Sequence, residues 1–172
     1  MRSPRAMLLL LLAVAALQAG YYYPRLPERI ASHFDVAGRP NAASTKWEFL
    51  GVHVLMVGLL STIFLVLPAF IHRLPTALIN LPRKDYWLAP ERRAETLERF
   101  RDQLTWVGCA SILFTIAVMQ LVFEFNLEEG KEFSALSILI LIGIFIVFLL
   151  AWTIRMLRSY SVPRDAGRQG PR

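Results

Sequence analysis

The sequence predicts an all-α integral membrane protein with four transmembrane helices and a structured loop outside the membrane. Hydrophobic residues make up 55% of the 172 residues and charged residues only 19%. An ordinary soluble domain carries about 25% charged residues. The apolar residues are gathered in four long blocks, and Lys and Arg are concentrated in alternate connecting segments. Residues 1–157 are therefore expected to form a single transmembrane domain.

The four predicted spans cover residues 6–22, 49–71, 104–123 and 133–154. A helix needs roughly 20 apolar residues to cross a bilayer, with a range of about 17 to 25. The first block is short, and its basic start and apolar run also resemble a signal peptide. Cleavage would place Leu17 or Gln18 where a small residue is required. A retained first helix is therefore favoured.

Basic residues predict that both termini and the 72–103 loop lie in the cytoplasm. Of the 19 Lys and Arg residues, fourteen fall in these segments and five in the 23–48 loop and the turn before the last span. Cytoplasmic flanks carry the excess of basic residues in membrane proteins. The net charge of +6 is thus expected to favour anionic lipids on the cytoplasmic face of the bilayer. It is not interpreted as a nucleic-acid signal.

The 72–103 loop is predicted in two parts. Pro75, Pro82 and Pro90 exclude one continuous helix. A short interfacial helix is expected to begin at Pro90, before the third span, with Tyr86, Trp87 and Leu88 at membrane level. Pro68 is expected to kink the cytoplasmic end of the second span. Residues 158–172 are basic and lack an apolar period, which predicts a disordered cytoplasmic tail.

Two of the spans carry stripes of small residues. The members of these stripes are Thr105, Gly108, Ser111 and Thr115, beside Cys109, and Gly51, Gly58 and Thr62. Small residues allow helices to approach closely, so packing within the monomer is predicted. A ligand groove, a membrane-protein partner or a homo-oligomer is the alternative.

No catalytic constellation is recognisable, so neither enzyme activity nor a cofactor is expected. The predicted spans contain no Asp, Glu, Lys or Arg, which argues against an ion-coupled transporter. Ser32 and His33 are adjacent in an extended segment, so their side chains are expected to point in opposite directions. His33, Asp35 and His53 are candidate ligands for Zn²⁺ or another divalent metal. A loop hydrogen bond and an interfacial histidine would explain the same residues.

The 23–48 loop is the least generic part of the chain, and it predicts a small folded cap. Ala37-Gly38-Arg39-Pro40 predicts a tight turn with a positive φ at Gly38. Lys46 and Trp47 bring the chain back to the membrane. The candidate ligand-binding or recognition residues are Pro27, His33, Asp35, Gly38, Pro40, Asn41 and Lys46.

Several motifs resemble a bacterial membrane family of unknown function, whose best-known members are the SdpI-type toxin-immunity proteins. They are Tyr22-Tyr-Pro-Arg-Leu-Pro-Glu-Arg-Ile30, His33-Phe-Asp, Gly38-Arg-Pro-Asn41 and Lys46. The segment 79–93 resembles the cytoplasmic loop of that family through Asn80, Pro82, Tyr86, Trp87 and Pro90. Together the similar stretches cover residues 7–105. The pattern departs at Ala31 and Asn41, where the family has proline and aspartate.

The resemblance implies a non-enzymatic, multi-pass protein of the bacterial cytoplasmic membrane that acts in toxin immunity or envelope sensing. An accessory or scaffold subunit of a larger membrane transport or enzyme complex is one alternative. A divalent-metal-binding membrane protein that uses the outer loop is another.

Overall fold

A computed structural model describes residues 3–35, 37–128 and 133–161 of the chain. It is mostly helical, with a two-stranded hairpin between the first two long helices. The helices and strands are α1 (Pro4–Tyr22), β1 (Arg29–Phe34), β2 (Pro40–Thr45), α2 (Lys46–Ser61), α3 (Leu67–Ala69), α4 (Lys84–Trp87), α5 (Pro90–Leu127) and α6 (Ala135–Ser159). Among the described residues, four helical segments are long and apolar enough to cross a membrane. The predicted fold class is therefore confirmed.

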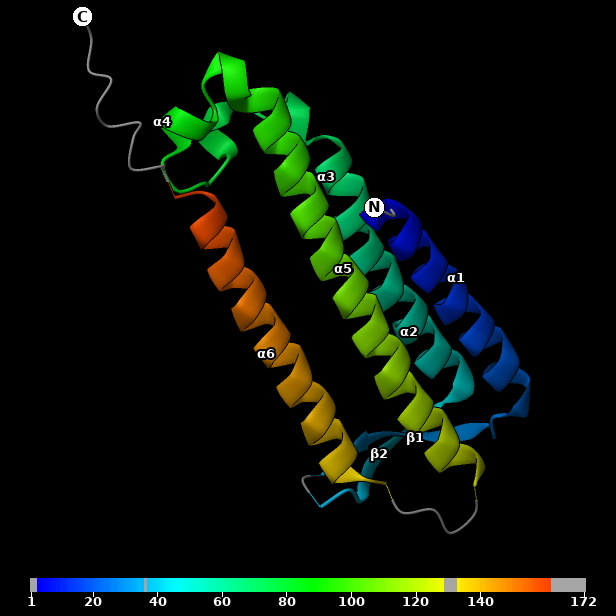
Figure 1. Ribbon diagram of the computed structural model, residues 1–172. Helices are drawn as coiled ribbons and strands as arrows, with labels where there is room; N and C mark the ends of the chain where they lie inside the picture. The colour runs from blue at the N-terminus through cyan, green and yellow to red at the C-terminus, as the bar shows by residue number, and fades with distance from the viewer. Residues whose placement is uncertain (1–2, 36, 129–132, 162–172) are drawn as a thin grey trace, which may run out of the picture.

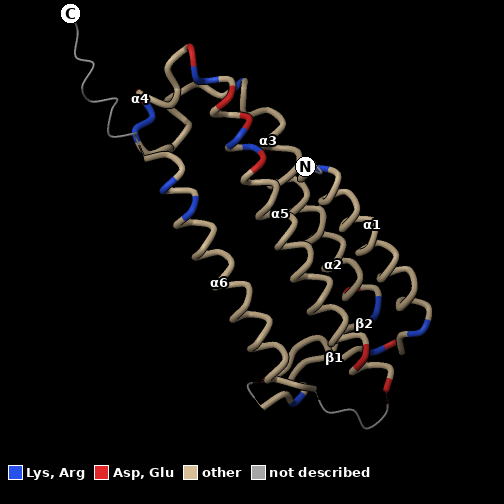
Figure 2. Tube along the Cα trace, in the orientation of Figure 1, with Lys and Arg blue, Asp and Glu red and all other residues tan. Residues whose placement is uncertain are grey.

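Figure 1 shows α1, α2 and α5 side by side, with α6 on the other side of α5. The hairpin lies at one end of the bundle, and α3 and α4 lie at the opposite end (Figure 1). Charged residues gather towards the two ends, and the middle stretches of the long helices are free of them (Figure 2). This arrangement fits a bilayer, whose hydrocarbon core excludes charge. That the hairpin end faces outwards stays a prediction from the basic residues.

Local sequence explains where α2 begins and how it ends. At its start, Thr45 Oγ1 accepts a hydrogen bond from Glu48 N (3.2 Å), and Glu48 Oε2 accepts one from Thr45 N (2.8 Å). This capping box satisfies two free N–H groups of the first turn. Near its end, residues Thr62–Val66 form a π-helical turn just before Pro68. Proline lacks an N–H and collides with the carbonyl four residues earlier, so the expected kink takes the form of a wider turn.

Helix α5 is the centre of the bundle and runs without a break for 38 residues. The expected interfacial helix is thus the first part of α5, since no proline after Pro90 interrupts it. Thr105, Ser111 and Thr115 are buried along one side of α5. A Cβ added to Gly108 would lie 2.5 Å from Phe64 Cβ of α2's π turn. The small residues of the third span therefore pack within the monomer, as predicted.

Helix α6 has no buried residue, and it contacts the rest of the bundle near its ends and at mid-length, where Phe145 stacks on Phe114 of α5 with a centroid distance of 4.8 Å. At the end opposite the hairpin, Tyr160 is buried with Leu88 and Leu97. The indole Nε1 of Trp87 donates a hydrogen bond to Tyr160 O (2.7 Å), so Trp87 contacts the residue that directly follows α6. At the hairpin end the ring of Phe133 stacks on Phe34, with a centroid distance of 3.7 Å.

Candidate functional site

The hairpin turn is held by Asp35 and Gly38. The carboxylate oxygen Oδ1 of Asp35 accepts hydrogen bonds from Ala37 N (2.9 Å) and Arg39 N (2.8 Å). The backbone N–H of Gly38 donates to Asp35 O (2.9 Å). Gly38 has φ +79°, a conformation that residues with a Cβ rarely adopt. The predicted turn and its positive φ are therefore confirmed, and Asp35 serves the turn.

The hairpin is docked on the ends of the long helices. The side-chain amide of Asn126 accepts from Ala31 N (2.8 Å) and donates to Ala31 O (3.1 Å). A proline at position 31, as in the resembling family, would lack the N–H needed for the first bond. Ile30 is fully buried against Leu26 and the end of α5. Lys46 Nζ lies 2.6 Å from Glu28 Oε1. The loop is thus a folded cap, as expected.

The predicted recognition residues divide into two groups. Asp35, Gly38 and Lys46 make the structural contacts just described. The others have exposed side chains on the cap, and they are Pro27, His33, Pro40 and Asn41. Only this second group is free to contact an external molecule without unfolding the cap.

Ser32 and His33 correct one expectation. Their side chains do not diverge, because Ser32 Oγ lies 3.1 Å from His33 Nδ1. The pairing of β1 with β2 is irregular between Ala31 and His33. Such a bulge breaks the alternation of side chains along a strand, so neighbouring residues can meet on one side.

The three predicted metal ligands lie in different settings. His33 is exposed on β1, Asp35 closes the hairpin turn, and His53 is buried on α2. Across the three described ranges, no group of three or more His, Cys, Asp or Glu side chains is placed to hold a metal ion. The structure therefore does not bring His53 together with the two loop residues as a metal site.

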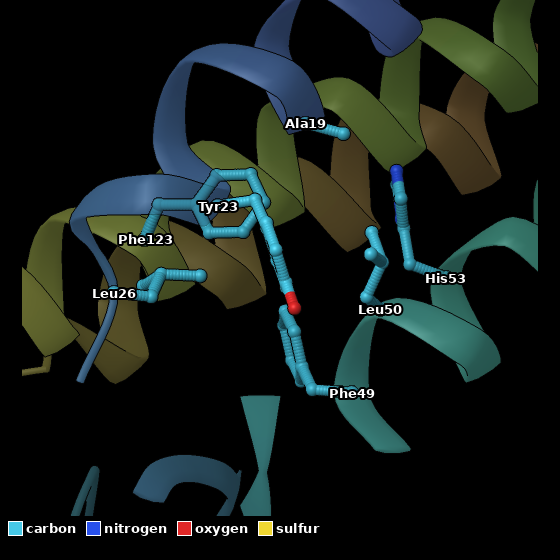
Figure 3. Close-up of a pocket in the computed structure, with 7 residues that line it drawn as sticks. All are labelled: Ala19, Tyr23, Leu26, Phe49, Leu50, His53 and Phe123. Atoms are coloured by element: carbon cyan, nitrogen blue, oxygen red, sulfur yellow. The ribbon is translucent and has the colours of Figure 1, made fainter. Parts of the chain in front are cut away.

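A small pocket lies beneath the cap, between the hairpin ends of α1, α2 and α5 (Figure 3). Its volume is about 10 Å³, and its lining residues are Ala19, Tyr23, Leu26, Phe49, Leu50, His53 and Phe123. The ring of His53 reaches towards Ala19 of α1, and the hydroxyl of Tyr23 lies beside Phe49 (Figure 3). Neither His53 Nδ1 nor the Tyr23 hydroxyl has a hydrogen-bond partner among the described residues. Buried polar atoms are seldom left in this state.

A larger groove continues from this pocket along α1 and α2. Its volume is about 300 Å³, and it is lined by Leu12, Ala15, Ala16, Ala19, His53, Val54, Val57 and Gly58. Nothing lies within 4 Å of a Cβ added to Gly51 or Gly58. The predicted close packing of this second stripe is therefore wrong at both glycines. At Gly58 the small residue opens the groove instead.

A chain of polar side chains that the sequence analysis did not single out joins α1 to α5. Gln18 Nε2 donates to Gln120 Oε1 (2.9 Å) and Ile116 O (3.0 Å). Gln120 Nε2 lies 2.6 Å from the Tyr22 hydroxyl and 2.8 Å from Glu124 Oε1. Hydrogen bonds of this kind hold helices together in lipid. The sequence did contain a sign of this contact, because Gln18 and Gln120 are side-chain amides within two predicted membrane spans.

The motif of residues 79–93 builds the end of the bundle opposite the hairpin. Tyr86 lies under the guanidinium of Arg92, 4.1 Å from ring centroid to Cζ, and Arg92 Nε donates to Tyr86 O (2.9 Å). Pro90 occupies the first turn of α5. Asn80 is exposed and Pro82 is half-buried beside the buried Leu81. These residues have mainly structural contacts.

The comparisons with known proteins assign no activity. No curated protein and no solved structure matches the chain. Residues 8–57 match a family model described as "Domain of unknown function (DUF1648)". This stretch contains most of α1, the whole hairpin and the first part of α2. The chain is thus a multi-pass membrane protein with a DUF1648 segment, and that segment carries the cap and every lining residue of the groove except Gly58.

Proposed function

We propose that this chain is a non-enzymatic protein of the bacterial cytoplasmic membrane, related to the SdpI-type proteins, that recognises an external molecule in toxin immunity or envelope sensing. The hairpin end would face outwards. The basic residues of the opposite end, among them Arg73, Arg83 and Lys84, would lie against anionic lipids of the inner leaflet.

The observation that carries this proposal is the way in which the cap is fixed. Asn126 bonds both backbone groups of Ala31, and Ile30 is fully buried beneath the hairpin. A simple connection between two spans needs neither feature. A rigid cap with exposed His33 and Asn41 is suited to recognition, because preformed surfaces lose less conformational freedom on binding.

The test is a deletion strain challenged with membrane-active peptides. Deletion is expected to increase sensitivity, and the wild-type gene is expected to restore resistance. Asn41→Ala removes an exposed side chain of the cap, and Asn80→Ala makes the same change at the opposite end of the bundle. Asn41→Ala is expected to complement less well than Asn80→Ala. Unchanged sensitivity of the deletion strain would contradict the proposal.

A second candidate is an accessory or scaffold subunit of a larger membrane complex. It is favoured by α6, which has no buried residue and exposes Leu139, Ile146 and Leu150. Such a helix can pack against a partner within the bilayer. Purification in mild detergent distinguishes the two candidates, since a subunit is expected to carry a second protein in fixed ratio. Recovery of this chain alone would exclude the subunit.

A further inference from the structure

We propose that the groove between α1 and α2 binds one single-chain, uncharged amphiphile from the bilayer, with its hydroxyl-type head group at His53. This inference deepens the proposed function, on which it rests, by naming the ligand class of the site below the cap. It assigns the apolar chain to the groove and the polar atom of the ligand to the buried histidine.

The groove has the size and lining that an apolar chain requires. Its volume of about 300 Å³ lies at the lower end of the roughly 300–1,000 Å³ found for small-molecule sites. Alanine side chains on α1 and Gly58 on α2 leave the space open. Val54 is 59% exposed, so the groove communicates with the bilayer along its side. A chain can therefore enter laterally without crossing the cap.

His53 supplies the polar end of the groove. Its residue exposure is only 5%, and Nδ1 has no hydrogen-bond partner among the described residues. An unpaired buried polar group costs about 1–3 kcal/mol, so packing alone does not explain a histidine here. The His53 ring extends from α2 towards Ala19 of α1 (Figure 3). His53 and Ala19 both line the groove. Nδ1 itself is enclosed, so a ligand hydroxyl would bond the imidazole on the side of the ring that lines the groove.

The lining defines the chemistry of the head group. Among the described residues that line the groove there is no Asp, Glu, Lys or Arg. A charged head would lose its hydration without gaining a counter-ion, which is costly in an apolar site. A neutral imidazole nitrogen donates or accepts according to its tautomer. A hydroxyl can do both and therefore fits either tautomer.

The position of His53 along α2 also fits an amphiphile. It lies seven residues after Lys46, the first residue of α2, which is about 10 Å at 1.5 Å per residue. The groove continues from there to Gly58 and Leu12, deeper in the bundle. The head would thus lie towards the cap and the chain towards the middle of the bilayer.

The test uses the purified full chain in phosphatidylcholine nanodiscs and a photoreactive dodecanol carrying a diazirine. Labelled peptides are mapped by mass spectrometry. Saturable labelling of α1 and α2 residues along the groove, competed by unlabelled dodecanol, is expected. Gly58→Leu fills the groove and should reduce this labelling several-fold. Gly143→Leu makes the same change on α6, where an added Cβ also meets nothing within 4 Å, and should leave the labelling unchanged.

A second pair of variants tests the head group. The photoreactive dodecanol is compared with the hydrocarbon probe that lacks the hydroxyl. His53→Phe should reduce the preference for the alcohol by about tenfold, the loss expected for one hydrogen bond. Tyr23→Phe removes another unpaired buried polar atom, which does not line the groove, and should keep the preference. Because His53→Phe removes an unsatisfied group, its Tm is expected to be unchanged or higher.

The outcomes separate this inference from the proposed function. Equal labelling of Gly58→Leu and wild type, or an alcohol preference that survives His53→Phe, would overturn the groove site. If the chain still protected cells against the peptide challenge, the proposed function would stand, and the exposed cap would be the recognition site. Conversely, specific labelling without any protection in the challenge assay would leave the ligand site intact and remove the immunity function.

Discussion

Gly38 is the residue at which the cap meets the connection to the last helix. Its φ of +79° favours glycine, and a Cβ placed there would collide with the backbone carbonyl of Phe133. Glycine is therefore required at position 38 both by the backbone conformation of the turn and by the close contact with Phe133. Because the obstacle is backbone, it cannot move aside as a flexible side chain would. Each constraint alone disfavours any other amino acid.

Gly38→Ala is expected to destabilise the protein by about 1–3 kcal/mol, the usual cost of a strained backbone conformation. Gly51→Ala is the matched control, because an added Cβ there meets nothing within 4 Å. Its change should be neutral or stabilising by about 0.5–1 kcal/mol through helix propensity. Thermal unfolding in one detergent measures both. Equal Tm values for the two variants would contradict the role assigned to Gly38.

Tyr160 gives a prediction about pH. Burial of its phenol raises the pKa to about 12, and the nearby positive charge of Arg99 only partly opposes this. Because the folded pKa is above the usual value of about 10, the neutral phenol contributes stability that is complete below pH 10. That contribution is lost as the pH rises through about 12. The Tm of the wild type should therefore fall over this interval.

The matched variants are Tyr160→Phe and Tyr21→Phe. The first removes the ionisable group and should flatten the alkaline fall of Tm. The second removes a tyrosine that is 57% exposed and should leave the fall as in the wild type. An identical pH profile for all three proteins would show that ionisation of Tyr160 does not matter for stability.

At the level of single residues, local signals were predictable and distant partners were not. The turn at Gly38 could be predicted because glycine before Arg39-Pro40 is a short-range pattern. The bonds from Asn126 to Ala31 join residues 95 positions apart, and no local pattern encodes such a pair. His53 was one of three candidate metal ligands, with His33 and Asp35, but it lies on the side of α2 that faces α1. The sequence shows a histidine in an otherwise apolar helix, but it does not show which neighbouring helix the side chain faces.

At the scale of the elements, the π-helical turn that follows α2 approaches α5 closely. Gly108 of α5 faces Phe64 in the π turn of α2, with Leu8 of α1 also nearby. The π turn precedes Pro68, and such turns are frequent at functional positions in helices. The composition of a small-residue stripe could be recognised in the sequence for both spans. Which stripe packs and which stays open depends on helix rotation, which composition does not specify.

Gly108→Ala is expected to destabilise the bundle by about 1–3 kcal/mol through overpacking. Gly143→Ala on α6, where an added Cβ meets nothing within 4 Å, is the control and should not destabilise. Phe64→Gly removes the opposing Cβ. Because the two residues are in contact, the double variant should be less destabilised than the sum of the single variants. Strict additivity in the unfolding measurements would refute the close approach.

At the scale of the whole molecule, the hairpin and the opposite end of the bundle, where α4 lies, are linked by two routes. Helix α5 contacts the cap through Asn126, and its Leu97 packs in one cluster with Leu88, the residue that follows α4. Helix α6 lies between Phe133, stacked on Phe34 of the cap, and Tyr160, bonded to Trp87. A change at the cap therefore has two helical paths to the opposite face. Sequence predicted the ends of these paths but not the contacts that join them.

The orientation of the bundle in the membrane can be tested directly by cysteine labelling. Cys109 is the chain's one cysteine and is 5% exposed, so background labelling should be low. Asn41→Cys and Asn80→Cys place identical reporters on exposed residues at opposite ends of the bundle. A membrane-impermeant maleimide added to spheroplasts should label Asn41→Cys. It should label Asn80→Cys only after permeabilisation, because the basic flanks are expected to lie inside. The reverse pattern would place the cap in the cytoplasm, where it could not meet an external toxin, and would contradict the recognition role proposed for the cap. The groove opens sideways to the bilayer, so its ligand site does not depend on this outcome.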